Sequence, residues 1–175
     1  MVMHMKAYNP FISPVLFSRR LTIFIIALFC LAFSQNSTAA TCNFDQMNGN
    51  LMDFGILSAA QSSPVFDSAT LQFTCTADGL LPTVSYSVAI SAGSSGDFNQ
   101  RTMRFAAWSI SYNLFIDPTF ITVFGDGMPG NNSQTVSGLC VSGVTCIVPV
   151  YGKLDGGQSL RAGQYSDAVT ITLSF

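Results

Sequence analysis

Apolar and polar side chains alternate with a period of two residues in four stretches of this chain, and this pattern constrains the fold most strongly. The stretches cover residues 71–76, 84–91, 109–116 and 169–175. Successive side chains of a β-strand point to opposite faces, so this alternation predicts strands with one buried face. Helical periodicity is hard to find beyond the first 40 residues. The sequence therefore predicts an all-β protein.

Short groups of turn-forming residues separate the alternating stretches. Many short strands with frequent turns, in a chain of this length, are typical of an antiparallel β-sandwich. No internal repeat or linker is evident, so we expect one folded domain. The turn signals lie at residues 78–79, 92–97, 117–118, 125–127, 129–132 and 155–157.

The first 40 residues have the composition of a secretory signal peptide. Residues 1–20 contain basic but no acidic side chains, residues 21–33 are an apolar run, and residues 34–40 are small or polar. We expect cleavage after Ala40, which leaves a domain at residues 41–175. An uncleaved membrane anchor is the alternative. The apolar run of 13 residues disfavours it, because a spanning helix needs about 20. We therefore expect no membrane span in the mature chain.

The charges and residue types of the mature chain exclude several classes of function. Removing 40 of the 175 residues leaves 135, with four basic and nine acidic side chains and a net charge of −5. A sparse, acidic chain has no basic surface for nucleic acid. It also contains no Glu, and His4 lies in the signal segment. Histidine-based catalysis and most zinc sites are therefore unavailable, and we expect no metal or cofactor.

Two aspartates are candidates for a catalytic pair of carboxylates. Asp117 and Asp126 could act together in glycoside hydrolysis, which uses paired carboxylates. Both lie in ordinary turn signals, Asp117-Pro118 and Gly125-Asp126-Gly127. We therefore expect the protein not to be an enzyme. We expect Arg101 and Arg104 to lie on a solvated strand face or to pair with an aspartate.

Four cysteines remain after the signal segment, an even number that favours disulfides in an exported domain. They allow three pairings, of which we favour Cys42–Cys75 with Cys140–Cys146. The first bond would close a long loop and contribute about 3–4 kcal/mol in the chain-entropy model. A four-cysteine zinc site is the alternative, and the spacings do not fit it.

The last alternating stretch predicts a strand that could pair with another chain. Val169, Ile171, Leu173 and Phe175 share one face, and no Lys or Pro guards the strand. An unguarded apolar edge is a template for strand pairing between chains. On the pattern alone, a place in the middle of a sheet is an equal alternative.

Three short motifs follow one another in the order Arg101-Thr102-Met103, Tyr112-Asn113-Leu114-Phe115-Ile116-Asp117 and Phe124-Gly125-Asp126-Gly127. Together they resemble motifs of the spore coat protein U family, the subunits of archaic (Csu-type) chaperone–usher pili. Cys42, Phe54-Gly55 and Cys75 lie where the family has its disulfide and its Phe-Gly turn, and Phe124 stands where the family has Trp. The match covers essentially the whole mature chain. The residues that match the family motifs are Arg101, Tyr112, Asp117, Gly125, Asp126, Gly127, Tyr151, Gly152, Gln158, Gly163, Tyr165 and Asp167.

The resemblance implies an incomplete immunoglobulin-like antiparallel β-sandwich that lacks its final strand. In that family a periplasmic pilus chaperone lends the missing strand, and an outer-membrane usher exchanges it for a strand of another pilus subunit. It also implies export through the periplasm to the cell surface and roles in fibre building, adhesion and biofilm formation. The residues expected to pair with the lent strand are Val169, Ile171, Leu173 and Phe175.

One departure from the family concerns the segment before Cys42. Subunits that extend a fibre carry a donor segment there, whereas residues 35–41 (QNSTAAT) contain no large apolar side chain. An apolar groove cannot be filled by such a segment. We therefore expect a tip-associated or terminating subunit that accepts a strand without donating one. The alternative is a stand-alone secreted coat or surface-binding module with a self-complete β-sandwich.

Overall fold

The computed structural model describes residues 39–45, 52–58, 60–79 and 83–175. The expected signal peptide lies outside these residues except for Ala39 and Ala40, and Ala40 opens the first strand. No helix in the described part of the chain is long and apolar enough to span a bilayer. The strands are β1 (Ala40–Phe44), β2 (Val65–Ala77), β3 (Thr83–Ile90), β4 (Arg101–Phe105), β5 (Trp108–Phe115), β6 (Val123–Phe124), β7 (Ser133–Gln134), β8 (Val136–Val141), β9 (Thr145–Leu154) and β10 (Ile171–Ser174), with one 3-10 turn, η1 (Gly93–Ser95).

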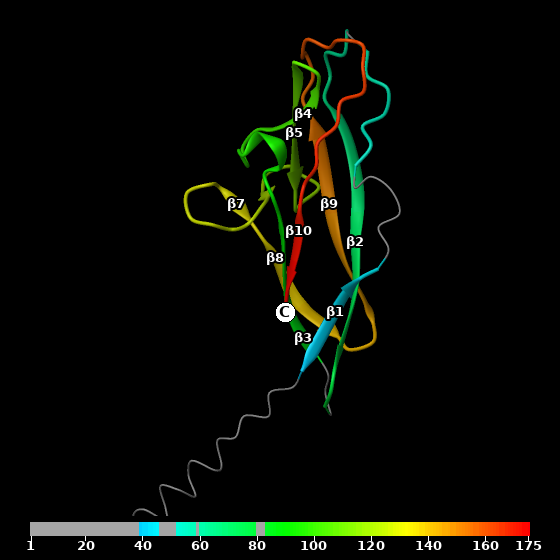
Figure 1. Cartoon of the computed structure of the whole chain (residues 1–175), viewed down its shortest axis with the longest axis vertical. Helices are drawn as coiled ribbons and strands as arrows, with labels where there is room; N and C mark the ends of the chain where they lie inside the picture. The colour runs from blue at the N-terminus through cyan, green and yellow to red at the C-terminus, as the bar shows by residue number, and fades with distance from the viewer. Residues whose placement is uncertain (1–38, 46–51, 59, 80–82) are drawn as a thin grey trace, which may run out of the picture. The chain divides into compact units, whose positions relative to one another are not determined.

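The strands form two sheets, as Figure 1 shows. The larger sheet has the order β1-β2-β9-β5-β6-β7, and β4 also pairs with β5. The smaller sheet has the order β10-β3-β8. The short turn between β8 and β9 carries the chain from the smaller sheet into the larger one, which explains how one chain builds both layers.

The expectation of a purely antiparallel sandwich is wrong at one place. Strands β6 and β7 pair in parallel, with Val123 opposite Ser133. The loop between them folds on itself instead of making a hairpin, because the carboxylate of Asp126 accepts hydrogen bonds from the Met128 amide and the Asn131 side chain. The amide of Gly125 then donates to the carbonyl of Gln134 at 2.9 Å. The result is a mixed sheet.

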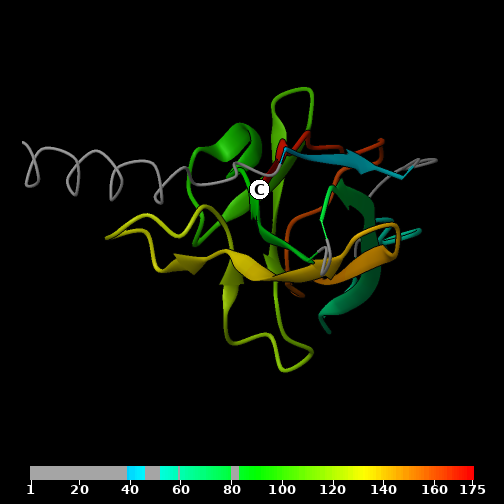
Figure 2. The same cartoon turned by 90° about the horizontal axis from the view of Figure 1, so that it is seen from below.

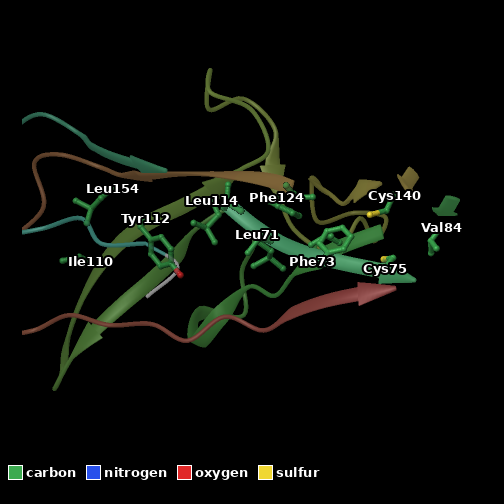
Figure 3. Packing of buried hydrophobic residues seen from close by; sticks show 14 residues of the cluster. Leu71, Phe73, Cys75, Val84, Ile110, Tyr112, Leu114, Phe124, Cys140 and Leu154 are labelled. Carbon is green, nitrogen blue, oxygen red and sulfur yellow. The ribbon is translucent and has the colours of Figure 1, made fainter. Parts of the chain in front are cut away.

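The alternating residues predicted as strands supply the core between the sheets. Strand β2 is longer than the predicted stretch and pairs with β9 from Val65↔Leu154 to Thr74↔Thr145. Its inward residues Leu71 and Phe73 are fully buried. Figure 3 shows both within the buried cluster, with Leu71 near Leu114 of β5. The core comprises Leu71, Phe73, Cys75, Val84, Val88, Ile90, Ile110, Tyr112, Leu114, Phe124, Cys140, Val148, Val150 and Leu154.

The structure contains both of the favoured disulfides. Cys42 of β1 is bonded to Cys75, its direct partner in the β1–β2 register. Cys140 and Cys146 are bonded across the turn between β8 and β9. The first bond fixes an edge strand to the larger sheet, and the second holds the turn between the two sheets.

Candidate functional site

Strand β10 lies at an open edge of the smaller sheet. Within the described residues β10 pairs only with β3, from Ile171↔Ile90 to Ser174↔Ser87. Ile171 and Leu173 are half-buried and pack on the core, whereas Thr172 is exposed. Figures 1 and 2 both place the end of β10 near the start of β1. Among the residues that the structure describes, one edge of this strand is thus without a neighbour.

Phe175 lies just beyond this strand. The alternating pattern predicts that Phe175, like Val169, Ile171 and Leu173, belongs to the edge that pairs with a lent strand. Strand β10 ends at Ser174, and the Phe175 side chain is 57% exposed. Val169 lies before the strand, half-buried against the core. The regular strand is therefore shorter than the alternating pattern.

A cleft of about 750 Å³ continues from the lead-in to β10. One wall is residues 52–57 and the other is residues 160–167 with Val169. Figure 1 shows both connecting segments at the end of the molecule where β4 and β5 meet. Apart from a single bridge at Ser166, neither wall is part of a sheet. The floor is formed by Met103 of β4 with Ile110, Tyr112 and Leu114 of β5.

Glycines allow the cleft walls to lie close to the scaffold. A Cβ on Gly152 of β9 would meet Phe54 Cζ at 2.9 Å and the Met52 sulfur at 3.0 Å. A Cβ on Gly163 would overlap the Phe105 ring. Both positions match the family motif. Because these glycines have no side chain, the two walls can pack closely against the strands.

Arg101 does not lie on a solvated face, and it has no ion-pair partner among the described residues, so that expectation is wrong. Its side chain is fully buried. The guanidinium donates to the carbonyl of Ser91 from Nε (3.1 Å) and Nη2 (2.9 Å), to the carbonyl of Phe124 (2.7 Å) and to Asn113 Oδ1 (2.6 Å). Burial lowers the Arg101 pKa. Carbonyl and amide oxygens, rather than a carboxylate, accept the hydrogen bonds of the charged guanidinium.

Two further motif residues meet next to this arginine. Tyr112 Oη donates to Asp167 Oδ2 at 2.7 Å, and Asp167 Oδ1 accepts from the amides of Ser94 and Ala168, both at 2.9 Å. Burial, and then the hydrogen bond to Asp167, raise the pKa of Tyr112 well above its ordinary value. Tyr112 and Asp167 also line the cleft. They join its floor to one of its walls.

The remaining motif residues serve local structure. Gln158 bonds both the amide and the carbonyl of Ser111, which continues β5 pairing through a side chain. The oxygen of Tyr165 accepts from the Arg161 amide at 3.1 Å. Gly127 has a positive φ of 69° that suits glycine. Tyr151 lies on β9 opposite Phe115, and Gly125 is buried beside Ser133.

Asp117 and Asp126 each close a separate loop. Asp117 accepts from the side chain of Thr119 and from the amides of Thr119, Ile121 and Thr122. These bonds, led by that of the Thr119 hydroxyl, lower the Asp117 pKa to about 2. Hydrogen bonds from Met128 and Asn131 lower the Asp126 pKa. The carboxylates are occupied by loop contacts, so the arrangement gives no reason to assign them a catalytic role.

Sequence reasoning did not identify Ser91 and Asn113 as site residues. Both accept hydrogen bonds from Arg101, and Asn113 Nδ2 also donates to the carbonyls of Phe98 and Asn99. The position of Asn113 next to Tyr112 in the motif could have indicated it. Nothing in the sequence around Ser91 separates it from other loop serines.

Comparison with known proteins agrees with the motif resemblance. The family model described as the Spore Coat Protein U domain matches residues 27–172. A curated relative, Protein U of Myxococcus xanthus, is 29% identical over 135 residues, which is 73% of each chain.

Two solved structures give weaker matches. One is the CsuC–CsuE complex of a chaperone and a tip adhesion subunit from archaic Csu pili of Acinetobacter baumannii, with 21% identity and a TM-score of 0.45. The other is a chaperone–tip adhesin complex of CFA/I fimbriae, with 12% identity and a TM-score of 0.44. The matches cover 78% and 77% of this chain, but only 40% and 42% of the matched chains.

Proposed function

This chain belongs to the Spore Coat Protein U domain family, and from that premise we propose that it is a subunit of a secreted surface fibre completed by a β-strand from another chain. The observation that carries the proposal is the open edge of β10 among the described residues, together with the cleft at the lead-in to this strand. We propose a structural or adhesive role and no enzymatic activity.

Strand addition suits the chemistry of this edge. An extended segment laid along β10 could form main-chain hydrogen bonds with it, while alternate apolar side chains of the segment enter the cleft. Burying each large apolar side chain contributes about 1.5–3 kcal/mol. Met52, Phe54 and Leu57 on one wall and Leu160 and Tyr165 on the other would surround such side chains.

The partners proposed for this site follow from the family resemblance. A periplasmic pilus chaperone would first supply the strand, and an outer-membrane usher would catalyse its exchange for a strand of another subunit. The subunit would thus be exported through the periplasm and displayed at the cell surface.

We also propose a tip-associated or terminating position in the fibre. Residues 34–41 contain no large apolar side chain that could fill a neighbour's cleft. The chain would accept a strand at β10 without offering one from the segment before Cys42.

The first experiment is export of the full chain with and without a pilus chaperone, followed by sizing and native mass spectrometry. We expect a one-to-one chaperone complex and little free monomer. The substitution Leu173→Asp should prevent capture, because it places a charge on the half-buried face of β10. Thr172→Asp on the exposed face is the matched control and should leave capture intact. A free, cooperatively folding monomer would contradict the proposal.

A second candidate is a self-complete coat or surface-binding module. It is favoured by a separate apolar group around the turn between β8 and β9, where Leu139, Val141, Val144 and Ile147 are all more than half exposed. Exposed apolar groups of this kind occur at contact surfaces. The same experiment decides between the candidates, because this module would purify alone.

A further inference from the structure

The wall of the cleft that leads into β10 is held by polar contacts as well as by the apolar packing of Leu160, Tyr165 and Val169. Between the end of β9 at Leu154 and the start of β10 at Ile171 the chain forms no strand, only a bridge between Ser166 and Arg104. The open side of β10 gives it no second neighbour among the described residues. Its alignment therefore depends on how residues 166–170 are anchored.

Three residues of this lead-in are bound to the scaffold. Ser166 exchanges backbone hydrogen bonds with Arg104, at 2.8 and 3.1 Å. The carboxylate of Asp167 accepts from Tyr112 and from the amide of Ser94. The Thr170 amide donates to Ser91 Oγ at 2.8 Å, and its carbonyl accepts from the Ser91 amide at 2.9 Å. None of these contacts needs an occupant in the cleft.

Arg101 stabilises the residues that make two of these contacts, Ser91 and Asp167. Two of its nitrogens donate hydrogen bonds to the carbonyl of Ser91, the residue that is hydrogen-bonded to Thr170. Its charge also attracts the Asp167 carboxylate, although the two groups do not form an ion pair. In the partly dehydrated interior this attraction is stronger than in water. Arg101, Tyr112 and Asp167 therefore act on one segment.

We propose that Asp167, held by Tyr112 and backed by Arg101, is a positioning residue that keeps the lead-in and β10 aligned while the cleft is empty. The proposal rests on the proposed function, because alignment matters only if a strand is received. An edge that is already ordered loses less conformational freedom on binding. A larger fraction of molecules is then competent to receive the strand.

The test compares two substitutions that each remove one phenolic hydroxyl from the cleft lining. Tyr112→Phe removes the donor to Asp167, and Tyr165→Phe removes only the acceptor for the Arg161 amide. Hydrogen exchange of the full exported chain, without any ligand, should be about tenfold faster at residues 167–174 in Tyr112→Phe, in line with a bond to a charged group. Tyr165→Phe should not change it there.

Exchange that rises equally over the whole domain, or no more than in Tyr165→Phe, would overturn the proposal. Asp167→Asn gives a second variant, and its effect should not add to that of Tyr112→Phe if the two residues act as a pair. Additive effects on exchange at residues 167–174 would also overturn it.

A binding measurement separates this proposal from the proposed function. The probe is an uncharged ten-residue peptide of alternating Val and Thr. Tyr112→Phe should slow its association about threefold and leave its dissociation rate unchanged. Unchanged association with faster dissociation would contradict positioning. If the unmodified protein does not bind the peptide at all, the proposed function fails, and the exchange comparison still decides the role of Asp167.

Discussion

At the scale of single residues, Arg101 carries its charge in the interior without an opposite charge in contact. Its donors satisfy two backbone carbonyls and one side-chain amide from three different parts of the chain. A buried acceptor left without a donor costs about 1–3 kcal/mol. The residue is thus a structural junction whose loss affects several segments at once.

Replacing Arg101 by Met should therefore lower the free energy of unfolding by about 3 kcal/mol or more, because several buried acceptors lose their donor. Arg104 lies three residues further along β4 with an exposed side chain, so Arg104→Met is the matched control. It should change the free energy by less than about 0.5 kcal/mol. Urea unfolding of both variants measures the difference, and equal effects would contradict the role assigned to Arg101.

Asp117 should make stability depend on pH in the acid range. Its folded-state pKa of about 2 is lower than the ordinary value, so its contribution is complete above the unfolded-state pKa of about 3.9 and is lost as the pH falls towards 2. The full chain should exceed Asp117→Asn in stability at pH 6, and this advantage should shrink by pH 2. Urea unfolding at both pH values tests this, and a constant advantage would contradict it.

At the scale of strands and loops, the disulfides should differ in their contribution. Cys42–Cys75 spans 33 residues and Cys140–Cys146 only six. Chain entropy assigns about 4 kcal/mol to the first and about 2 kcal/mol to the second. Unfolding of the paired serine variants should show this order. Mass spectrometry without reductant should find two disulfides in the unmodified chain, and free thiols would contradict the expected compartment.

The sequence predicted the long strands well, because their alternation comes directly from one buried and one exposed face. Strands β2, β3 and β5 contain three of the four alternating stretches almost entirely. The parallel β6–β7 pair could not be predicted, since a strand of two residues is too short to show an alternation of apolar and polar side chains. Burial of Arg101 was also missed, because its acceptors at Ser91 and Phe124 come together only in the fold. The Tyr112–Asp167 contact joins residues 55 apart.

At the scale of the whole molecule, the chain combines few charges with a cleft that presents both apolar and polar surface. Only Asp53, Arg161 and Asp167 are charged among the residues that line it. Binding there should depend on apolar burial and main-chain hydrogen bonds, which salt screens little.

The affinity for the uncharged Val/Thr peptide should therefore change less than about threefold between 50 mM and 500 mM sodium chloride, far less than the loss that phosphate contacts produce. Isothermal titration calorimetry at the two salt concentrations measures this. A peptide of the same length with alternating Lys and Thr is the control and should not bind. A steep decrease with salt would mean that charge, rather than the apolar cleft, drives recognition.

The bond between Cys42 and Cys75 also sets how the domain responds to a pulling force. Tension applied through the segment before β1 reaches Cys42 and passes through sulfur directly into β2, its paired neighbour. The chain between the two cysteines, which are 33 positions apart, is bypassed, and about 110 Å of chain cannot be drawn out. In a fibre under flow, such a domain would lengthen less before failing, and its breaking point would lie in the non-covalent contacts beyond β2.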